Sequence, residues 1–95
     1  MVYFIQRESG GPIKIGYTKS NAKSRMRSLQ TAHAEKLVLL ATSDRHAEKD
    51  LHERFADLRL HGEWFRADVR LLAWIWAHAS VTREGFTAMP KAWGK

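Results

Sequence analysis

Four polar side chains in the first half of the chain have the types that phosphodiester hydrolysis needs. That reaction requires a deprotonated nucleophile, cations around the phosphoryl oxygens and help for the leaving oxygen. A tyrosine beside a cation could take the proton of the attacking water, because the cation favours the phenolate. An arginine offers a phosphate a planar fork of donors, and a lone glutamate can anchor a hydrated Mg²⁺ or Mn²⁺. The candidates are Tyr3, Lys14, Arg25 and Glu48.

Tyr3 and Lys14 lie on two segments that are typical of a β-hairpin. Residues 3–7 and 13–17 alternate between apolar and polar side chains, and a glycine-containing turn separates them. If the numbers of paired residues sum to 17 or 19, Tyr3 and Lys14 project from the same face, whereas an even sum separates them. The odd register also gathers four apolar side chains on the other face as core: Val2, Phe4, Ile13 and Ile15. Gly16, inside the second strand, is typical of a close approach by a backbone or a ligand.

Three helices and a third strand are expected after the hairpin. Ser20 or Asn21 can cap a helix that runs to about residue 31. The short apolar segment 36–42 is best read as a strand. Asp44 can cap an amphipathic helix that runs to about residue 58, and Asp68 can cap a third helix that ends near residue 78.

These elements predict one α+β domain over residues 1–79, with a three-stranded antiparallel sheet flanked by about three helices. After Ser80 the hydrophobic periodicity ends. We expect residues 80–95 to form a C-terminal tail, which Phe86 or Trp93 could dock on the domain.

The positive charge of the chain is concentrated near its start. Residues 1–34 contain six Lys and Arg against one acid, Glu8, whereas the remaining 61 residues contain ten against nine. Such asymmetry is typical of a surface that binds a polyanion, most commonly a nucleic acid, although a basic surface without a ligand would look the same. The expected contacts to nucleic acid are Tyr17, Lys19, Lys23 and Arg27.

Several classes of protein are excluded by composition. The chain has no cysteine, so it cannot form disulfides or cysteine-ligated zinc sites. No run of about eighteen apolar residues is present, so no membrane association is expected. The strand pattern starts within three residues of Met1, which leaves no room for a signal peptide. We therefore expect a cytoplasmic location.

Five short motifs occur in a fixed order along residues 1–76. They are Val2-Tyr3, Lys14-Ile15-Gly16, the run R-M-R-S-L-Q at 25–30, E-K-D-L-H-E-R-F at 48–55 and G-E-W-F at 62–65. In this order they resemble the GIY-YIG nuclease superfamily, and in particular a short branch that is common in phage and bacterial proteins.

The resemblance implies a three-stranded antiparallel sheet flanked by helices and an endonuclease site that uses one divalent metal ion. By matched position, Tyr3 would be the base, Lys14 its neighbour, Arg25 the phosphate ligand and Glu48 the metal ligand. His52 matches the histidine of the branch's helix motif and could carry a proton. Met1 and Lys14 stand where the superfamily has the glycine of its first motif and the tyrosine of its second.

The sequence therefore predicts an endonuclease that hydrolyses phosphodiester bonds in DNA with a single Mg²⁺ or Mn²⁺; RNA stays open as a substrate. An alternative is a catalytically weak or inactive nucleic-acid-binding module on the same fold. Leu29 favours that alternative, because the superfamily usually has His or Tyr one turn after the arginine. A third possibility is a protein-interaction domain that uses the tryptophan-rich helix at residues 69–78.

Overall fold

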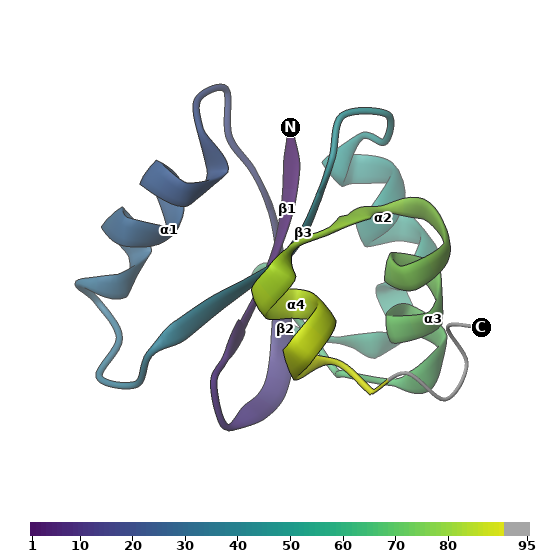
Figure 1. Cartoon of the computed structure of the whole chain (residues 1–95). Coiled ribbons are helices and arrows are strands. Elements are labelled where there is room, and N and C mark those ends of the chain that lie inside the picture. The colour runs from purple at the N-terminus through teal and green to yellow at the C-terminus, as the bar shows by residue number, and fades with distance from the viewer. Residues whose placement is uncertain (91–95) are drawn as a thin grey trace.

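The computed structural model describes residues 1–90, which form a six-stranded antiparallel sheet and four α-helices (Figure 1). The strands lie in the order β4-β5-β2-β1-β3-β6. Their bounds are β1 (Val2–Arg7), β2 (Gly10–Tyr17), β3 (Leu37–Ser43), β4 (Arg59–His61), β5 (Trp64–Phe65) and β6 (Ser80–Val81). The helices are α1 (Ala22–Gln30), α2 (Glu48–Arg54), α3 (Val69–His78) and α4 (Arg83–Ala88), and a 3₁₀ turn, η1 (Ala56–Leu58), precedes β4.

The α+β class predicted from the sequence is confirmed, but the expected count of three strands is wrong. The three expected strands correspond to β1, β2 and β3. The additional strands β4, β5 and β6 contain only two or three residues each. Segments of that length are too short to show the alternation by which a strand is recognised.

The segment that the sequence assigned to a C-terminal tail contributes a strand to the sheet and an additional helix. β6 pairs with β3, and α4 follows directly. Phe86 lies on α4, with its ring centroid 5.5 Å from that of Trp76. Trp93 lies outside the described residues. Among the helices in residues 1–90, none is both long enough and apolar enough to cross a membrane.

The register of the β1–β2 hairpin is the predicted odd one. Tyr3 pairs with Gly16 and Ile5 with Lys14, so the paired numbers sum to 19. Tyr3 and Lys14 therefore project from the same face of the sheet. The opposite face carries the four apolar side chains that the sequence grouped together: Val2, Phe4, Ile13 and Ile15.

The two faces of the sheet carry different helices. On the Tyr3 face, α1 encloses a small core with Ile5, Leu37 and Leu39. On the other face, α2 and α3 enclose the larger core, which contains Phe55 and Trp74. Figure 1 shows α1 standing apart from α2 and α3, with the sheet between them. Side chains that act together at a site must therefore either share the α1 face or reach it around the sheet edge.

The expected helix caps are correct for α1 and α3 but wrong for α2. Asn21 Oδ1 accepts hydrogen bonds from the backbone N–H groups of Lys23 at 2.8 Å and Ser24 at 3.2 Å. Asp68 caps α3 in the same way. Helix α2 was expected to start after Asp44, but it starts at Glu48, and its N-cap residue makes no side-chain cap.

The late start of α2 has a local cause. The Ser43 hydroxyl accepts a hydrogen bond from the Arg45 N–H at 3.3 Å and lies 2.9 Å from His46 Nδ1. These bonds hold the segment in a turn, because short polar side chains compete with the helix for backbone groups. Glu48 consequently lies in the first turn of the helix rather than in its second.

Candidate active site

Tyr3 is buried on the α1 face of the sheet, with only 1% of its surface exposed. Its ring covers the backbone of Gly16, its cross-strand neighbour. A Cβ atom on Gly16 would overlap the ring's Cζ atom and the hydroxyl oxygen. A close approach does occur at this glycine, but the group that approaches is the Tyr3 side chain rather than the backbone or ligand that was expected. Only glycine leaves room for the tyrosine hydroxyl above β2.

Arg25 extends from α1 to the same place. Its guanidinium hydrogen-bonds the Tyr3 side chain, and this bond, together with the Coulombic effect of Tyr3, raises the pKa of Arg25 above its ordinary value. A smaller contribution comes from the charge of Glu63. Arg25 itself is exposed. The buried tyrosine is thus covered by a cation that solvent can reach.

Lys14 lies on the next strand, on the same face as Tyr3. Its Nζ is 3.1 Å from Oε1 of Glu63, and its side chain is only 15% exposed. Lys14 also pairs across strands with Trp64 of β5, and its Nζ lies 5.5 Å from the centre of the indole ring. Arg7 approaches the same ring at 5.8 Å. Lys14 is therefore held by an ion pair and by an aromatic face.

His52 and Glu48 reach this site from α2 at the edge of β2. His52 Nε2 is 2.9 Å from the backbone carbonyl of Ile15 and 3.5 Å from Glu48 Oε2. Because a carbonyl only accepts hydrogen bonds, Nε2 carries the hydrogen. A proton exchanged by this histidine would therefore use Nδ1. The bond to Ile15 also brings the start of α2 next to the strand residues that carry Lys14 and Gly16.

Glu48 and Glu63 form a carboxylate pair between α2 and the β4–β5 turn. Burial raises the pKa of Glu48, and its hydrogen bond with Glu63 and the charge of Glu63 raise it further. Burial acts in the same direction on Glu63, but hydrogen bonds from Glu48 and Lys14 outweigh it and lower the pKa of Glu63. Glu48 therefore binds a proton more readily than an ordinary glutamate, and Glu63 binds one less readily. Two partly buried carboxylates beside each other favour a proton or a cation between them.

Glu63 is the residue of this cluster that the sequence did not single out. It stands in the G-E-W-F segment, directly after Gly62, whose φ of 54° forms the turn between β4 and β5. Its backbone carbonyl also accepts the Ile15 N–H at 2.9 Å. The only sequence signal was its place in a motif of the resembled branch, because a single acid in a turn has no periodic pattern.

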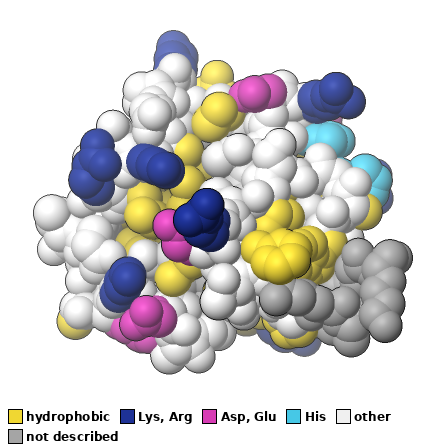
Figure 2. All heavy atoms as spheres, viewed as in Figure 1, with side chains coloured by type: hydrophobic (Ala, Val, Ile, Leu, Met, Phe, Trp, Pro, Cys, Tyr) yellow, Lys and Arg dark blue, Asp and Glu magenta, His cyan; other side chains and the backbone are white. Residues whose placement is uncertain are grey.

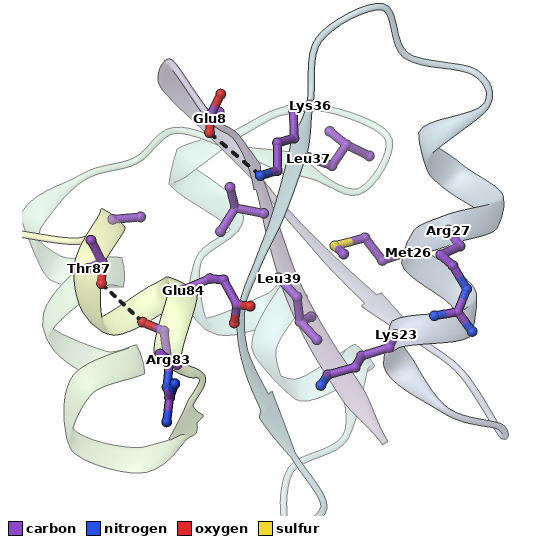
Figure 3. A pocket seen from close by; sticks show the side chains of 12 residues that line it. Glu8, Lys23, Met26, Arg27, Lys36, Leu37, Leu39, Arg83, Glu84 and Thr87 are labelled. Carbon is purple, nitrogen blue, oxygen red and sulfur yellow. Dashed lines mark hydrogen bonds and ion pairs between the residues drawn. The ribbon is translucent and has the colours of Figure 1, made fainter.

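The residues predicted to contact nucleic acid lie on two sides of α1. Tyr17 and Lys19 line an open hollow beside Arg25. Lys23 and Arg27 instead line a groove of about 640 Å³ between α1 and α4, which Arg83 lines from the α4 side (Figure 3). In Figure 2 this region shows basic side chains around an apolar strip, with acidic side chains among them. The structure therefore does not bring the four predicted contacts together on one surface.

The five predicted catalytic residues do gather around residues 14–16 of β2. Tyr3 and Arg25 contact each other above Gly16, while Lys14, Glu48 and His52 are connected through Glu63 and the Ile15 carbonyl. Glu48, His52 and Glu63 line a hollow of about 560 Å³, and Arg59 lines it as well. Within residues 1–90, no three His, Asp or Glu side chains are arranged as a metal site. Leu29 packs against the small core beneath α1, the cluster that also contains Tyr3.

Comparison with known families adds one finding. Residues 1–78 match the T5orf172 domain, a domain type related to GIY-YIG and nuclease-like folds. Comparisons with curated proteins and with solved structures gave no match. Because the matched region covers most of the chain and contains the whole candidate site, the chain belongs to the T5orf172 domain family.

Proposed function

We propose that this protein is a metal-dependent endonuclease of the GIY-YIG type that hydrolyses phosphodiester bonds in DNA. Membership of the T5orf172 family suggests a nuclease or DNA-binding role. The observation that carries the proposal is the contact between Tyr3 and Arg25 above Gly16, next to the Lys14–Glu63 ion pair. A base, a phosphate ligand and an acidic pair thus surround one short stretch of β2.

In this proposal Tyr3 accepts the proton of the attacking water and Arg25 binds the scissile phosphate. An arginine that donates to the tyrosine oxygen stabilises negative charge developing there, because charge-assisted hydrogen bonds are stronger than neutral ones. The same guanidinium has donors left for a phosphate oxygen, since its fork carries five N–H groups. Tyr3 is nearly inaccessible while Arg25 covers it, so substrate binding and uncovering of the base would occur together.

The acidic pair suits a divalent ion that keeps most of its water ligands. Magnesium commonly takes only one or two carboxylates from a protein, and the pair offers Glu48 with Glu63 beside it. The raised pKa of Glu48 supports this fit, because the carboxylate repulsion that contributes to it would be relieved by a cation between the two groups. A bound Mg²⁺ or Mn²⁺ would supply positive charge beside the phosphoryl oxygens. Glu48 would be the principal ligand and Glu63 the second.

His52 would handle a proton close to the metal ligands. Its Nε2–H is fixed by the Ile15 carbonyl, so its ring orientation is set before substrate binds. The edge of the ring also contacts Phe65, with centroids 4.9 Å apart. Nδ1 is then the atom available to give or receive a proton.

Cleavage of supercoiled plasmid by the purified protein tests the proposal. Nicking should require Mg²⁺ or Mn²⁺, should stop in EDTA, and should be lost in Tyr3→Phe and Glu48→Ala. Arg83→Ala is a suitable control, because Arg83 is an exposed α4 residue outside the site. Nicking that survives in both site variants, or that ignores EDTA, would contradict the assignment.

The alternative function is a nucleic-acid-binding module with little or no catalysis. The packing of Leu29 against the core favours it, because no proton-handling side chain enters the site from that position. Such a module would bind DNA with a steep salt dependence and would show no dependence on Mg²⁺. A wild-type protein that binds in this way but never nicks plasmid would establish the alternative.

A further inference from the structure

A hollow beside the candidate site has an unusual lining. It measures about 400 Å³ and lies between the end of β2, the loop that follows it and one side of α1. Lys19 and Arg25 contribute its two cations, and Tyr17 lies at the end of β2. Four hydroxyl side chains complete the lining: Thr18, Ser20, Ser24 and Ser28. No acidic side chain of residues 1–90 lines it, although the chain contains ten acids.

This combination of groups suits an anion with several oxygen atoms. Serine and threonine hydroxyls rotate and can each donate a hydrogen bond, and the two cations supply charge. Within residues 1–90, no hydrogen bond or ion pair engages the Lys19 ammonium. The Lys19 side chain is therefore available to an incoming ligand.

The loop that forms the hollow is ordered by its own hydrogen bonds. The Thr18 N–H donates to the Met1 carbonyl at 3.0 Å, and the Thr18 hydroxyl accepts the Ser20 N–H at 3.2 Å. Thr18 is itself buried. On α1, Ser24 and Ser28 are four residues apart and thus share one side of the helix with Arg25. A site fixed in this way loses little conformational entropy when a ligand binds.

Arg25 connects the hollow with the candidate active site. The same side chain lines the hollow and contacts Tyr3. A nucleic-acid strand that places one phosphate at Arg25 and Tyr3 would therefore place a neighbouring phosphate in the hollow. Because phosphate contacts carry no sequence information, this contact would be the same for every DNA sequence.

The groove on the other side of α1 is a less suitable place for a strand. Its cations alternate with Glu8 and Glu84, and Lys36 lies 3.9 Å from Glu8 (Figure 3). Its floor is aliphatic, with Leu37 and Leu39, and offers no aromatic ring on which a base could stack. Mixed charge and an aliphatic floor do not match a row of phosphates.

We propose that the hollow lined by Lys19, Ser20, Ser28 and Arg25 binds the phosphate that neighbours the scissile one on the cleaved DNA strand. This inference rests on the proposed function, since it takes Arg25 as the ligand of the scissile phosphate. It makes Lys19 and the α1 hydroxyls a sequence-independent subsite, with Arg27 at its margin, since Arg27 Nη2 donates to Ser24 Oγ at 3.1 Å. It leaves Lys23 outside the path of that strand.

Binding of a duplex oligonucleotide in EDTA, followed by fluorescence anisotropy over a series of salt concentrations, tests this subsite. Lys19→Ala should weaken binding and reduce the slope of log affinity against log salt by about one, equally for two duplexes of unrelated sequence. Ser28→Ala should weaken binding by about three- to tenfold without changing the slope, because it removes a hydrogen bond but no charge. Arg83→Ala is the matched control. Arg83 is also an exposed cation, but it lies on α4, across the groove from α1.

The subsite would be overturned if Lys19→Ala and Arg83→Ala changed the affinity for DNA equally. It would also be overturned if wild-type binding did not depend on salt concentration. Plasmid cleavage with Mg²⁺, measured on the same preparations, separates this result from the proposed function. A Lys19-dependent slope without any cleavage would show that the hollow binds a DNA phosphate, but it would overturn the endonuclease and with it the assignment of that phosphate as the neighbour of a scissile one. Cleavage by the wild type, together with a Lys19→Ala variant that binds DNA like the wild type, would support the endonuclease and count against the subsite.

Discussion

Glu63 Oε1 lies 3.1 Å from Lys14 Nζ, and the same carboxylate accepts a hydrogen bond from Glu48. One side chain in a turn thus connects a lysine of the central hairpin with the first residue of α2. The charge of Glu63 also acts on Arg25. Glu63 is therefore the residue whose removal should disturb most of the site at once.

Replacing Glu63 by glutamine should reduce catalysis more than stability. The variant keeps the shape of the side chain but removes the charge that orients Lys14 and supports Glu48. We expect plasmid nicking to fall by about 10- to 100-fold, as for other groups that orient metal ligands. The free energy of unfolding should fall by less than about 1 kcal/mol, because the pair is partly exposed. Loss of stability without loss of nicking would show that Glu63 is only structural.

The raised pKa of Glu48 predicts how stability changes with pH. Its pKa is raised in the folded protein, so the folded state binds more protons than the unfolded state above the ordinary glutamate value of 4.5. Stability should therefore fall as the pH rises through this range. The lowered pKa of Glu63 acts only at lower pH, where its contribution is lost as that carboxylate is protonated.

The variant Glu48→Gln should remove this fall in stability. Its amide can donate to Glu63 at every pH, as the protonated carboxyl does in the wild type. Urea unfolding near pH 5 and near pH 8 should give a smaller difference for the variant than for the wild type, and the variant should be the more stable protein at the higher pH. Identical pH dependence in both proteins would argue against a raised pKa of Glu48.

Gly16→Ala tests the close approach of Tyr3 to β2. The added methyl would meet the tyrosine ring, so the free energy of unfolding should fall by about 1–3 kcal/mol, as for other overpacked cores. Nicking should fall as well, because the tyrosine hydroxyl must move. A double-mutant cycle with Tyr3→Ala supplies the control. The two effects should be strongly non-additive, and additive values would mean that the strain lies elsewhere.

Trp64 should stabilise the hairpin through the two cations on its ring. Lys14 and Arg7 lie 5.5 and 5.8 Å from the ring centre, and such contacts contribute about 0.5–1 kcal/mol each. Trp64→Leu should therefore lower the free energy of unfolding by about 1–2 kcal/mol. Trp64→Phe, which keeps an aromatic face, should lie between that variant and the wild type in denaturant unfolding. Equal losses in both variants would assign the effect to shape alone.

The sequence predicted the central hairpin well, because alternation and register are local properties. The odd register, which puts Tyr3 and Lys14 on one face, follows from parity once the apolar side chains are placed on the other face, although parity does not choose between the sums of 17 and 19. The start of α2 was missed, since the Ser43 turn depends on a side-chain hydrogen bond that no periodicity reveals. Glu63 was missed because its partners come from three different elements.

The separation of the basic residues around α1 could not be predicted from composition. Lys19 and Lys23 are four positions apart in the sequence, yet they line different hollows. The groove that Lys23 lines is formed in part by α4, which belongs to the segment that was expected to be a tail. The charge count identified residues 1–34 as the basic part of the chain. It contained no information on which of the two hollows each basic side chain lines.

The irregularity in the β1–β2 hairpin lies on the turn side of Gln6, where the pairing shifts before Arg7 meets Gly10. The five pairs from Val2–Tyr17 to Gln6–Ile13 are uninterrupted, and they hold Tyr3, Lys14 and Gly16 in place. Changes in the length of the turn are therefore absorbed before they reach these pairs. The tip at Glu8 and Ser9 is consequently the point at which a dye, an affinity tag or a second recognition domain could be inserted while the site keeps its geometry.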